Sequence, residues 1–171
     1  MRNAFLISAT IALVSTALAI SQRRAIHALL YLIVSLLALS VVFAAAGAPL
    51  AAGLEIIVYA GAIMVLFLFA VMLLNVQAPD DLAAGGRASL PAWLVAGSVG
   101  AALLYEMVSA ILRAGSPVSS AFSVAPKQVG QVLFGPYLIA VELSSFLLLV
   151  GLVGAFHLGR QDLQQEEGGP S

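Results

Sequence analysis

The stretch that decides the fold covers residues 53–75 and reads GLEIIVYAGAIMVLFLFAVMLLN. Its only charged residue is Glu55, which lies near its start. An α-helix needs roughly 20 predominantly apolar residues to cross a bilayer. Apolar residues occupy every side of such a helix here, which is typical of a helix surrounded by other helices and lipid. The stretch therefore predicts a membrane-spanning helix over residues 50–74.

The composition of the whole chain indicates the same class of protein. Of the 171 residues, 62% are apolar and 9% are charged, and the mean hydropathy is +1.09. A soluble domain usually has about 45–50% apolar and about 25% charged residues. Too few charges remain here to cover a surface that faces water, which excludes a soluble enzyme. The length leaves room for about five spanning helices with their connections.

Hydropathy and helix-breaking residues place these helices along the chain. We predict an all-α integral membrane protein whose five transmembrane helices cover residues 4–20, 25–46, 50–74, 90–112 and 136–158. Together they form a transmembrane domain over residues 1–160, and residues 161–171 form a polar C-terminal tail. Pro136 begins the last helix, because proline is favoured at the first helical position.

The first apolar run has a second interpretation. Arg2, the run itself and the small residues Ala17 and Ala19 resemble a secretory signal peptide with its cleavage site. Arg23 and Arg24 follow the run at once, however, and this is the wrong flank for a cleaved signal. We therefore favour a membrane-spanning helix.

Basic residues in the connections predict the orientation, because cytoplasmic loops carry an excess of Lys and Arg. With five spans, one side of the membrane holds Arg23, Arg24, Arg87 and Arg160, and the other holds Arg2, Arg113 and Lys127. The adjacent pair Arg23-Arg24 lies tightly against two helix ends. We therefore predict an N-terminus outside and a C-terminus in the cytoplasm.

The remaining composition excludes several kinds of site. Seven basic and eight acidic residues leave no basic surface for nucleic acid. The chain has no Cys, which removes disulfides, thiolate metal sites and iron–sulfur ligation. His27 and His157 are too few for a bis-haem core. We expect no catalytic residue in this chain, and no metal or cofactor bound by it.

Three acidic residues lie inside the predicted spans: Glu55, Glu106 and Glu142. The predicted topology places all three in the outer half of the membrane. A charged side chain in a spanning helix costs about 2.5–3.5 kcal/mol on insertion scales, so such residues usually have a function. They either form structural hydrogen bonds with neighbouring helices or take part in a proton relay. We take Glu55 and Glu142 as candidates for the relay and Glu106 as mostly structural.

The centre of the third predicted span combines small residues with one aromatic hydroxyl, in the order Tyr59-Ala60-Gly61-Ala62. Small residues in a membrane helix usually mark close packing against another helix. Alternatively, Gly61 permits an irregular turn such as a π-bulge, and such bulges are frequent at functional sites. Periodicity does not choose between these two interpretations.

Residues 54–67, LEIIVYAGAIMVLF, closely resemble the third helix of the subunit J family of proton-pumping NADH:quinone oxidoreductase, respiratory complex I. The mitochondrial counterpart of this family is NADH dehydrogenase subunit 6. Three further pieces fit in order: HALLYLI at 27–33, LFGPY at 133–137 with Val141-Glu142-Leu143, and AFHLGR at 155–160. The fourth predicted span matches nothing diagnostic, so Glu106 receives no role from the resemblance.

The resemblance implies a five-helix subunit in the membrane arm of the complex, in the bacterial cytoplasmic (inner) membrane, with the N-terminus outside. Its partners would be the other membrane-arm subunits and the lipid bilayer. FMN, iron–sulfur clusters, NADH and quinone would be bound by other subunits. In the family, the third helix carries a π-bulge whose conversion to α-helix is associated with switching between enzyme states. By position, that bulge would involve Tyr59, Gly61 and Val65.

The resemblance and the residues together give a set of candidates for a proton path or conformational switch: Glu55, Tyr59, Gly61, Val65, Phe67, Met72 and Glu142. We expect the departure from α-helix between Tyr59 and Phe67. Rotation of the helix there would move the side chains of Val65, Phe67 and Met72 across a neighbouring channel. The channel would then become dry or wettable.

Two other functions stay open: a purely structural helix-bundle subunit of a membrane complex, and a small ion transporter. A transporter would more often show an internal repeat, and none is visible between the two halves of the sequence.

Overall fold

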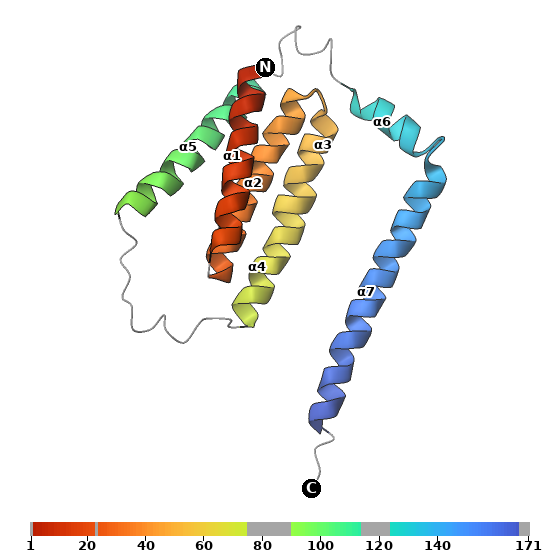
Figure 1. Cartoon of the computed structure of the whole chain (residues 1–171). Coiled ribbons are helices and arrows are strands. Elements are labelled where there is room, and N and C mark those ends of the chain that lie inside the picture. The colour runs from red at the N-terminus through yellow and green to blue at the C-terminus, as the bar shows by residue number, and fades with distance from the viewer. Residues whose placement is uncertain (1, 23, 75–89, 114–123, 168–171) are drawn as a thin grey trace. The chain divides into compact units, whose positions relative to one another are not determined.

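The computed structural model of the chain describes residues 2–22, 24–74, 90–113 and 124–167. These residues form helices joined by turns, and none of them lies in a strand, so the predicted all-α class is confirmed (Figure 1). The chain divides into two compact units, Met1–Ala125 and Pro126–Ser171.

The first unit contains α1 (Arg2–Ser21), α2 (Ala25–Ala45), α3 (Pro49–Leu54), the π-helical segment η1 (Glu55–Ile63), α4 (Met64–Leu73) and α5 (Leu90–Arg113). The segments α3, η1 and α4 follow one another without a break, and we call the whole of Pro49–Leu73 the third helix. Helix α2 is central, because it packs against α1, against α5 and against all three parts of the third helix.

Helices α1 and α2 meet through small and polar residues. The buried residues of these two helices are Ser8 and Ser15 on α1, and Ser35, Ala38, Ser40 and Val41 on α2. The Thr16 and Ser35 hydroxyl oxygens lie 2.7 Å apart and share a hydrogen bond, and Ser35 also donates to the carbonyl oxygen of Ala12 at 2.9 Å. Close approach at small residues, joined by a few hydrogen bonds, is typical of membrane helix pairs. These bonds fix the register of α1 against α2.

A glycine turn reverses the chain between α2 and α3 (Figure 1). Gly47 has a φ of 81°, which only glycine adopts without strain. The N–H groups of Gly47 and Ala48 donate to the carbonyl oxygens of Ala44 at 3.1 Å and Phe43 at 3.0 Å, the two bonds of a Schellman cap. Pro49 then begins α3, where its missing N–H costs nothing. The turn therefore returns the third helix alongside α2.

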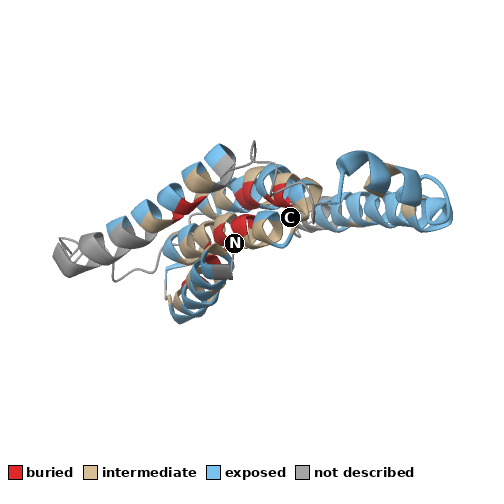
Figure 2. Ribbon diagram, turned by 90° about the horizontal axis from the view of Figure 1, so that it is seen from above, coloured by how far each residue is buried: buried red, intermediate tan, exposed pale blue. Residues whose placement is uncertain are grey.

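Few residues of the described chain are buried, as Figure 2 shows. The buried apolar side chains are Ala38, Val41, Ala52, Ala60, Met64 and Leu103. Most large apolar side chains are exposed instead, which is an arrangement for contact with lipid or other proteins rather than water.

Four described helices are long and apolar enough to cross a membrane: Asn3–Ser21, Ala25–Ala45, Pro49–Leu73 and Leu138–Gly159. The remaining predicted span, residues 90–112, lies within α5, which is not among the four. Part of the side chains of α5 lie outside the described residues. A crossing by α5, and with it the count of five spans, stays a prediction.

The second unit contains α6 (Pro126–Leu133) and α7 (Leu138–Glu167). Sequence analysis made no structural prediction for residues 113–135, which include α6. It placed Pro136 at the start of the last helix, but Pro136 lies in the turn before α7. The Tyr137 N–H donates to the carbonyl oxygen of Val132 at 3.2 Å, which closes this turn. A Cβ at Gly135 would lie 2.7 Å from the carbonyl oxygen of Gln131, so the turn needs glycine.

The conformation of Gly47 generates a prediction about stability. We expect Gly47→Ala to lower the free energy of unfolding by about 1–2 kcal/mol, because a Cβ disfavours the left-handed conformation by this amount. Gly53→Ala is the matched control, since a Cβ at Gly53 would meet no atom within 4 Å and alanine favours helix. Thermal unfolding of both variants in detergent tests the difference. Equal midpoints for the two would contradict the assigned cap.

Candidate functional site in the third helix

The third helix changes its hydrogen-bond register in its middle. Residues Glu55–Ile63 form a π-helix of nine residues, after which the chain returns to α-helix at Met64. The N–H of Met64 donates to the carbonyl oxygen of Tyr59, five residues earlier, where an α-helix would use the residue four earlier. The π-bulge predicted for this helix is therefore present.

The π segment starts earlier than the sequence indicated. We expected the departure from α-helix between Tyr59 and Phe67, and the observed segment overlaps that range over residues 59–63. Val65 and Phe67 lie in the regular helix α4. The segment reaches back to Glu55 because a π-helix changes the bonding partner of every residue in it, not of glycine alone.

The register change decides which side chains face α2. The buried residues along the third helix are Ala52, Glu55, Ala60 and Met64, at steps of three, five and four residues. An α-helix repeats its faces at steps of three and four, so the step of five is the mark of the π segment. It places the small Ala60 on the buried side, and it leaves Tyr59 52% exposed. In a regular α-helix, Tyr59 would follow Glu55 on that side.

Gly61 is adapted to the π register. A Cβ at this position would lie 3.0 Å from the carbonyl oxygen of Ile56, five residues earlier, which is closer than ordinary van der Waals contact. The π segment brings residue 61 close to that oxygen, whereas an α-helix would bring it close to the carbonyl oxygen four residues earlier. The absence of a side chain at Gly61 therefore avoids a close contact with this oxygen in the observed π form.

Glu55 is the first residue of the π segment and is only 7% exposed. Among the described residues, no hydrogen bond or ion pair to its carboxylate is found. It follows Pro49, the first residue of the third helix, by six residues, or about 9 Å along the helix axis. An ionised carboxylate in such a place is costly without a partner. Burial thus keeps Glu55 a candidate for proton exchange.

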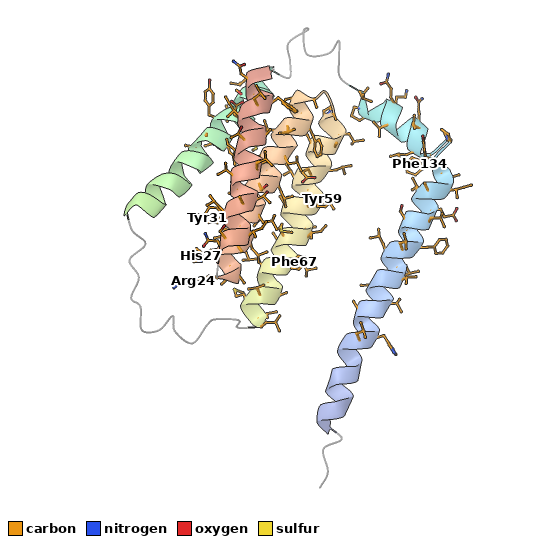
Figure 3. All side chains as sticks on the ribbon, viewed as in Figure 1. Arg24, His27, Tyr31, Tyr59, Phe67 and Phe134 are labelled. Atoms are coloured by element: carbon orange, nitrogen blue, oxygen red, sulfur yellow. The ribbon has the colours of Figure 1, made fainter. Side chains whose placement is uncertain are left out.

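The other candidates on the third helix are not buried with Glu55. The side chains of these candidates, Tyr59, Val65, Phe67 and Met72, are all exposed. Figure 3 shows Tyr59 nearer to the α3 end of the helix and Phe67 nearer to its α4 end. Glu142 lies on α7 in the second unit and is exposed. Within the first unit, the chain itself therefore brings Glu55, Ala60 and Gly61 together in a segment that packs against α2.

Sequence analysis took Glu106 as mostly structural. Glu106 on α5 is 7% exposed, as deeply buried as Glu55. Its position inside an apolar span was a signal that it is enclosed, but no motif supported it. Among the described residues, no three His, Cys, Asp or Glu side chains are placed to hold a metal ion.

Comparisons with known proteins identify the family. Residues 15–158 match the family model of NADH-ubiquinone/plastoquinone oxidoreductase chain 6. The chain belongs to this family. It is 46% identical to NADH-quinone oxidoreductase subunit J of Pseudomonas aeruginosa over 167 residues, which cover 96% of this chain and 100% of that protein. The subunit J of Escherichia coli K12 is 46% identical over 95% of this chain and 88% of its own length. The subunit J of Buchnera aphidicola subsp. Schizaphis graminum is 41% identical over 94% of this chain and 99% of its own length. These matches confirm the resemblance to the subunit J family that sequence analysis found.

The contact at Gly61 generates a structural prediction. We expect Gly61→Ala to shorten or abolish the π segment, because the added Cβ crowds the Ile56 carbonyl oxygen only in that register. Crowding of this kind typically costs about 1–3 kcal/mol. Electron cryomicroscopy of the variant should show hydrogen bonds of the α type through residues 55–63. Gly53→Ala in the same helix should keep the π segment. A π segment preserved unchanged in Gly61→Ala would show that the carbonyl yields and that glycine is not its cause.

Proposed function

We propose that this chain is a membrane-arm subunit of NADH:quinone oxidoreductase in the bacterial inner membrane, and that its third helix couples quinone reduction to proton translocation. The enzyme is the complex, and this chain supplies no redox centre. Membership of the chain 6 family supports the assignment to the complex. The observation that carries the coupling role is the π-helix at Glu55–Ile63 in a helix long enough to span the membrane.

The switch would consist of converting the π segment to α-helix. Conversion changes the register by one residue, which turns one part of the helix against the other by about 100°. Tyr59 then replaces Ala60 on the side that packs against α2. The same turn moves Val65, Phe67 and Met72 across the neighbouring subunit, where apolar side chains open or close a path for water. Glu55, at the start of the segment, exchanges a proton with that path.

A ligand-driven switch requires two states of similar free energy, within a few kcal/mol. In support of this, both registers would keep the backbone N–H groups inside the helix bonded, so the switch would not cost unpaired groups. Gly61 is the residue at which the two registers differ in steric demand. Quinone binding elsewhere in the complex would shift the populations through contacts that differ between the two states.

The remaining parts of the proposal concern topology and cofactors. Helix α5 would cross the membrane as the fourth of five spans, with the N-terminus outside. FMN, the iron–sulfur clusters and the quinone would be held by other subunits. For the clusters, the absence of Cys from this sequence supports this assignment, because iron–sulfur clusters are held by Cys thiolates. The contacts of the chain would be with other membrane-arm subunits and lipid.

A second candidate function is a purely structural subunit. The exposure of the large side chains of Tyr59, Val65, Phe67 and Met72 favours it, because such side chains on one helix also suit a fixed contact with a neighbouring subunit. In that case the π segment would set the shape of the helix and would not change between enzyme states.

The two functions differ in the expected effect of Gly61→Val. A β-branched side chain at Gly61 opposes the π register, and an energy of about 1–3 kcal/mol shifts a two-state equilibrium by one to two decades. We expect NADH oxidation with an artificial electron acceptor to be retained, and quinone reduction and proton uptake to fall about tenfold. The purified variant complex is assayed for all three.

The control for this experiment is Gly53→Val, in the same helix at a position where a Cβ meets no atom within 4 Å. Normal values of all three activities in Gly61→Val would remove the switch and leave the structural function. Loss of the whole complex in Gly61→Val alone would make Gly61 a packing residue.

Glu55→Gln tests the proton exchange separately from the register. The amide has nearly the same volume and cannot take up or release a proton at working pH. We expect the variant to assemble, to reduce the artificial acceptor normally and to show proton uptake several-fold below that of the unchanged complex. Full coupled activity would reduce Glu55 to a structural hydrogen-bonding group.

A further inference from the structure

Helix α6 is amphipathic, and the proposed switch gives it no part. At about 100° of rotation per residue, its polar and apolar residues separate into two opposite arcs of about 100° each. One arc holds Val129, Val132 and Leu133, which we call the α6 apolar face, and the other holds Lys127, Gln128 and Gln131. No residue of α6 is buried by the rest of the described chain. The α6 apolar face is therefore left to be covered from outside the chain.

The C-terminal end of α6 is joined to an apolar helix by a closed turn. The Phe134 N–H donates to the carbonyl oxygen of Gly130 at 2.9 Å, and the Leu138 N–H donates to that of Gly135 at 3.2 Å. Leu138 is also the first residue of the apolar span Leu138–Gly159 of α7. Figure 1 shows α6 turned away from the direction of α7 instead of continuing it. With α7 across the membrane, α6 is thus directed along the membrane surface.

The N-terminal end of α6 starts close to a second point of this kind. The Val124 N–H donates to the carbonyl oxygen of Gly47 at 2.9 Å. Gly47 lies in the turn between two helices that are each long and apolar enough to cross a membrane, so this turn lies at a membrane surface. Pro126 follows Val124 by two residues, which span at most about 7 Å. Both ends of α6 therefore lie close to points where spanning helices meet a membrane surface.

The residues beside the α6 apolar face favour the boundary between lipid and water. Phe134 and Tyr137, in the turn before α7, are 70% and 59% exposed, and Figure 3 shows Phe134 at the junction of the two helices. Aromatic side chains, above all those of Tyr and Trp, concentrate at the level of the lipid headgroups. Lys127 is exposed on the polar side, where a long side chain can extend its ammonium group to a phosphate. This combination is typical of a helix that lies in the membrane interface.

The small extent of the α6 apolar face favours lipid over a protein partner. The eight residues of α6 form about 12 Å of helix, with three aliphatic side chains on the face. A stable protein–protein contact buries about 800 Å² and about 20–30 residues on each partner. A helix this short would bind lipid weakly by itself, but its covalent link to a spanning helix keeps it at the surface at a high effective concentration. A bilayer is therefore sufficient to cover this face.

We propose that α6 is an interfacial helix that binds the phospholipid headgroup region of the membrane. The α6 apolar face lies against the upper part of the acyl chains, and Lys127 contacts a lipid phosphate, with a preference for anionic lipid. The helix fixes the depth at which α7 enters the bilayer. This surface does not depend on the switch in the third helix.

The test places a photoreactive diazirine amino acid at single positions of α6 in the assembled complex, in vesicles of equal parts phosphatidylcholine and phosphatidylglycerol. Illumination bonds this residue covalently to the molecule that touches it, and mass spectrometry of the chain identifies the product. We expect phospholipid adducts at Val132 and at Leu133. Gln131 is the matched control on the polar side, where water should consume the reagent and most of the adducts should be lost.

Two results at these positions would overturn the proposal. Adducts of Val132 and Leu133 with another subunit would make α6 a protein contact. Lipid adducts no more abundant than those at Gln131 would place the helix in water. Because two positions report on the same face, one of them decides if the other prevents assembly.

A second measurement tests the headgroup contact of Lys127. Phosphatidylglycerol is anionic and phosphatidylcholine is zwitterionic, and one Lys near an anionic surface favours anionic lipid by about fivefold. Adducts at Val132 should show this excess of phosphatidylglycerol, and Lys127→Gln should remove it. Equal capture of the two lipids with Lys127 in place would overturn the phosphate contact. Gly61→Val should give the same adducts whether or not it pumps, so failure of the switch and failure of this proposal are distinguishable.

Discussion

The structure depends on one constraint: inside a bilayer, every backbone N–H and carbonyl must find its partner within the protein. The third helix satisfies this rule in two ways along its length, with α-type bonds in α3 and α4 and π-type bonds over Glu55–Ile63. An irregular loop at this depth would leave backbone N–H and carbonyl groups unpaired. A change of register only moves each N–H from one carbonyl acceptor to the next along the helix. The π segment is therefore an irregularity that a membrane helix tolerates. It also selects which side chains face α2.

Packing against α2 gives the first unit its small core. Half of the described buried residues on the helices around α2 are alanine or serine: Ser8, Ser15, Ala52 and Ala60. At these small residues the backbones approach closely, so a one-residue change of register alters the packing. Ala60 illustrates this, because its replacement beside α2 by Tyr59 would need considerably more room. The same tight packing encloses Glu55 and Glu106, two carboxylates that lipid would not accept. Close packing thus explains why a change of helix register alters the buried contacts. It also explains why the side chains of Glu55 and Glu106 are buried.

Sequence alone predicted the helices well where their apolar runs are long, because hydropathy reports burial in lipid directly. It also indicated a π-bulge, through Gly61 and the family resemblance. It did not indicate the start of the segment at Glu55, since a helix that is apolar on all sides shows no phase change when its register slips. The short helix α6 and the place of Pro136 in a turn depend on local contacts at Gly135 that composition does not encode. The burial of Glu106 depends on the packing of three helices, which no single stretch of sequence reveals.

Helix α7 has a consequence for the biogenesis of the protein. None of the residues in its apolar span Leu138–Gly159 is buried by the chain, although its backbone bonds are satisfied within the helix. Such a segment enters a bilayer as an independent unit and needs no sister helix to be stable there. Insertion of α7 can thus precede its packing against any neighbour, whichever chain supplies that neighbour.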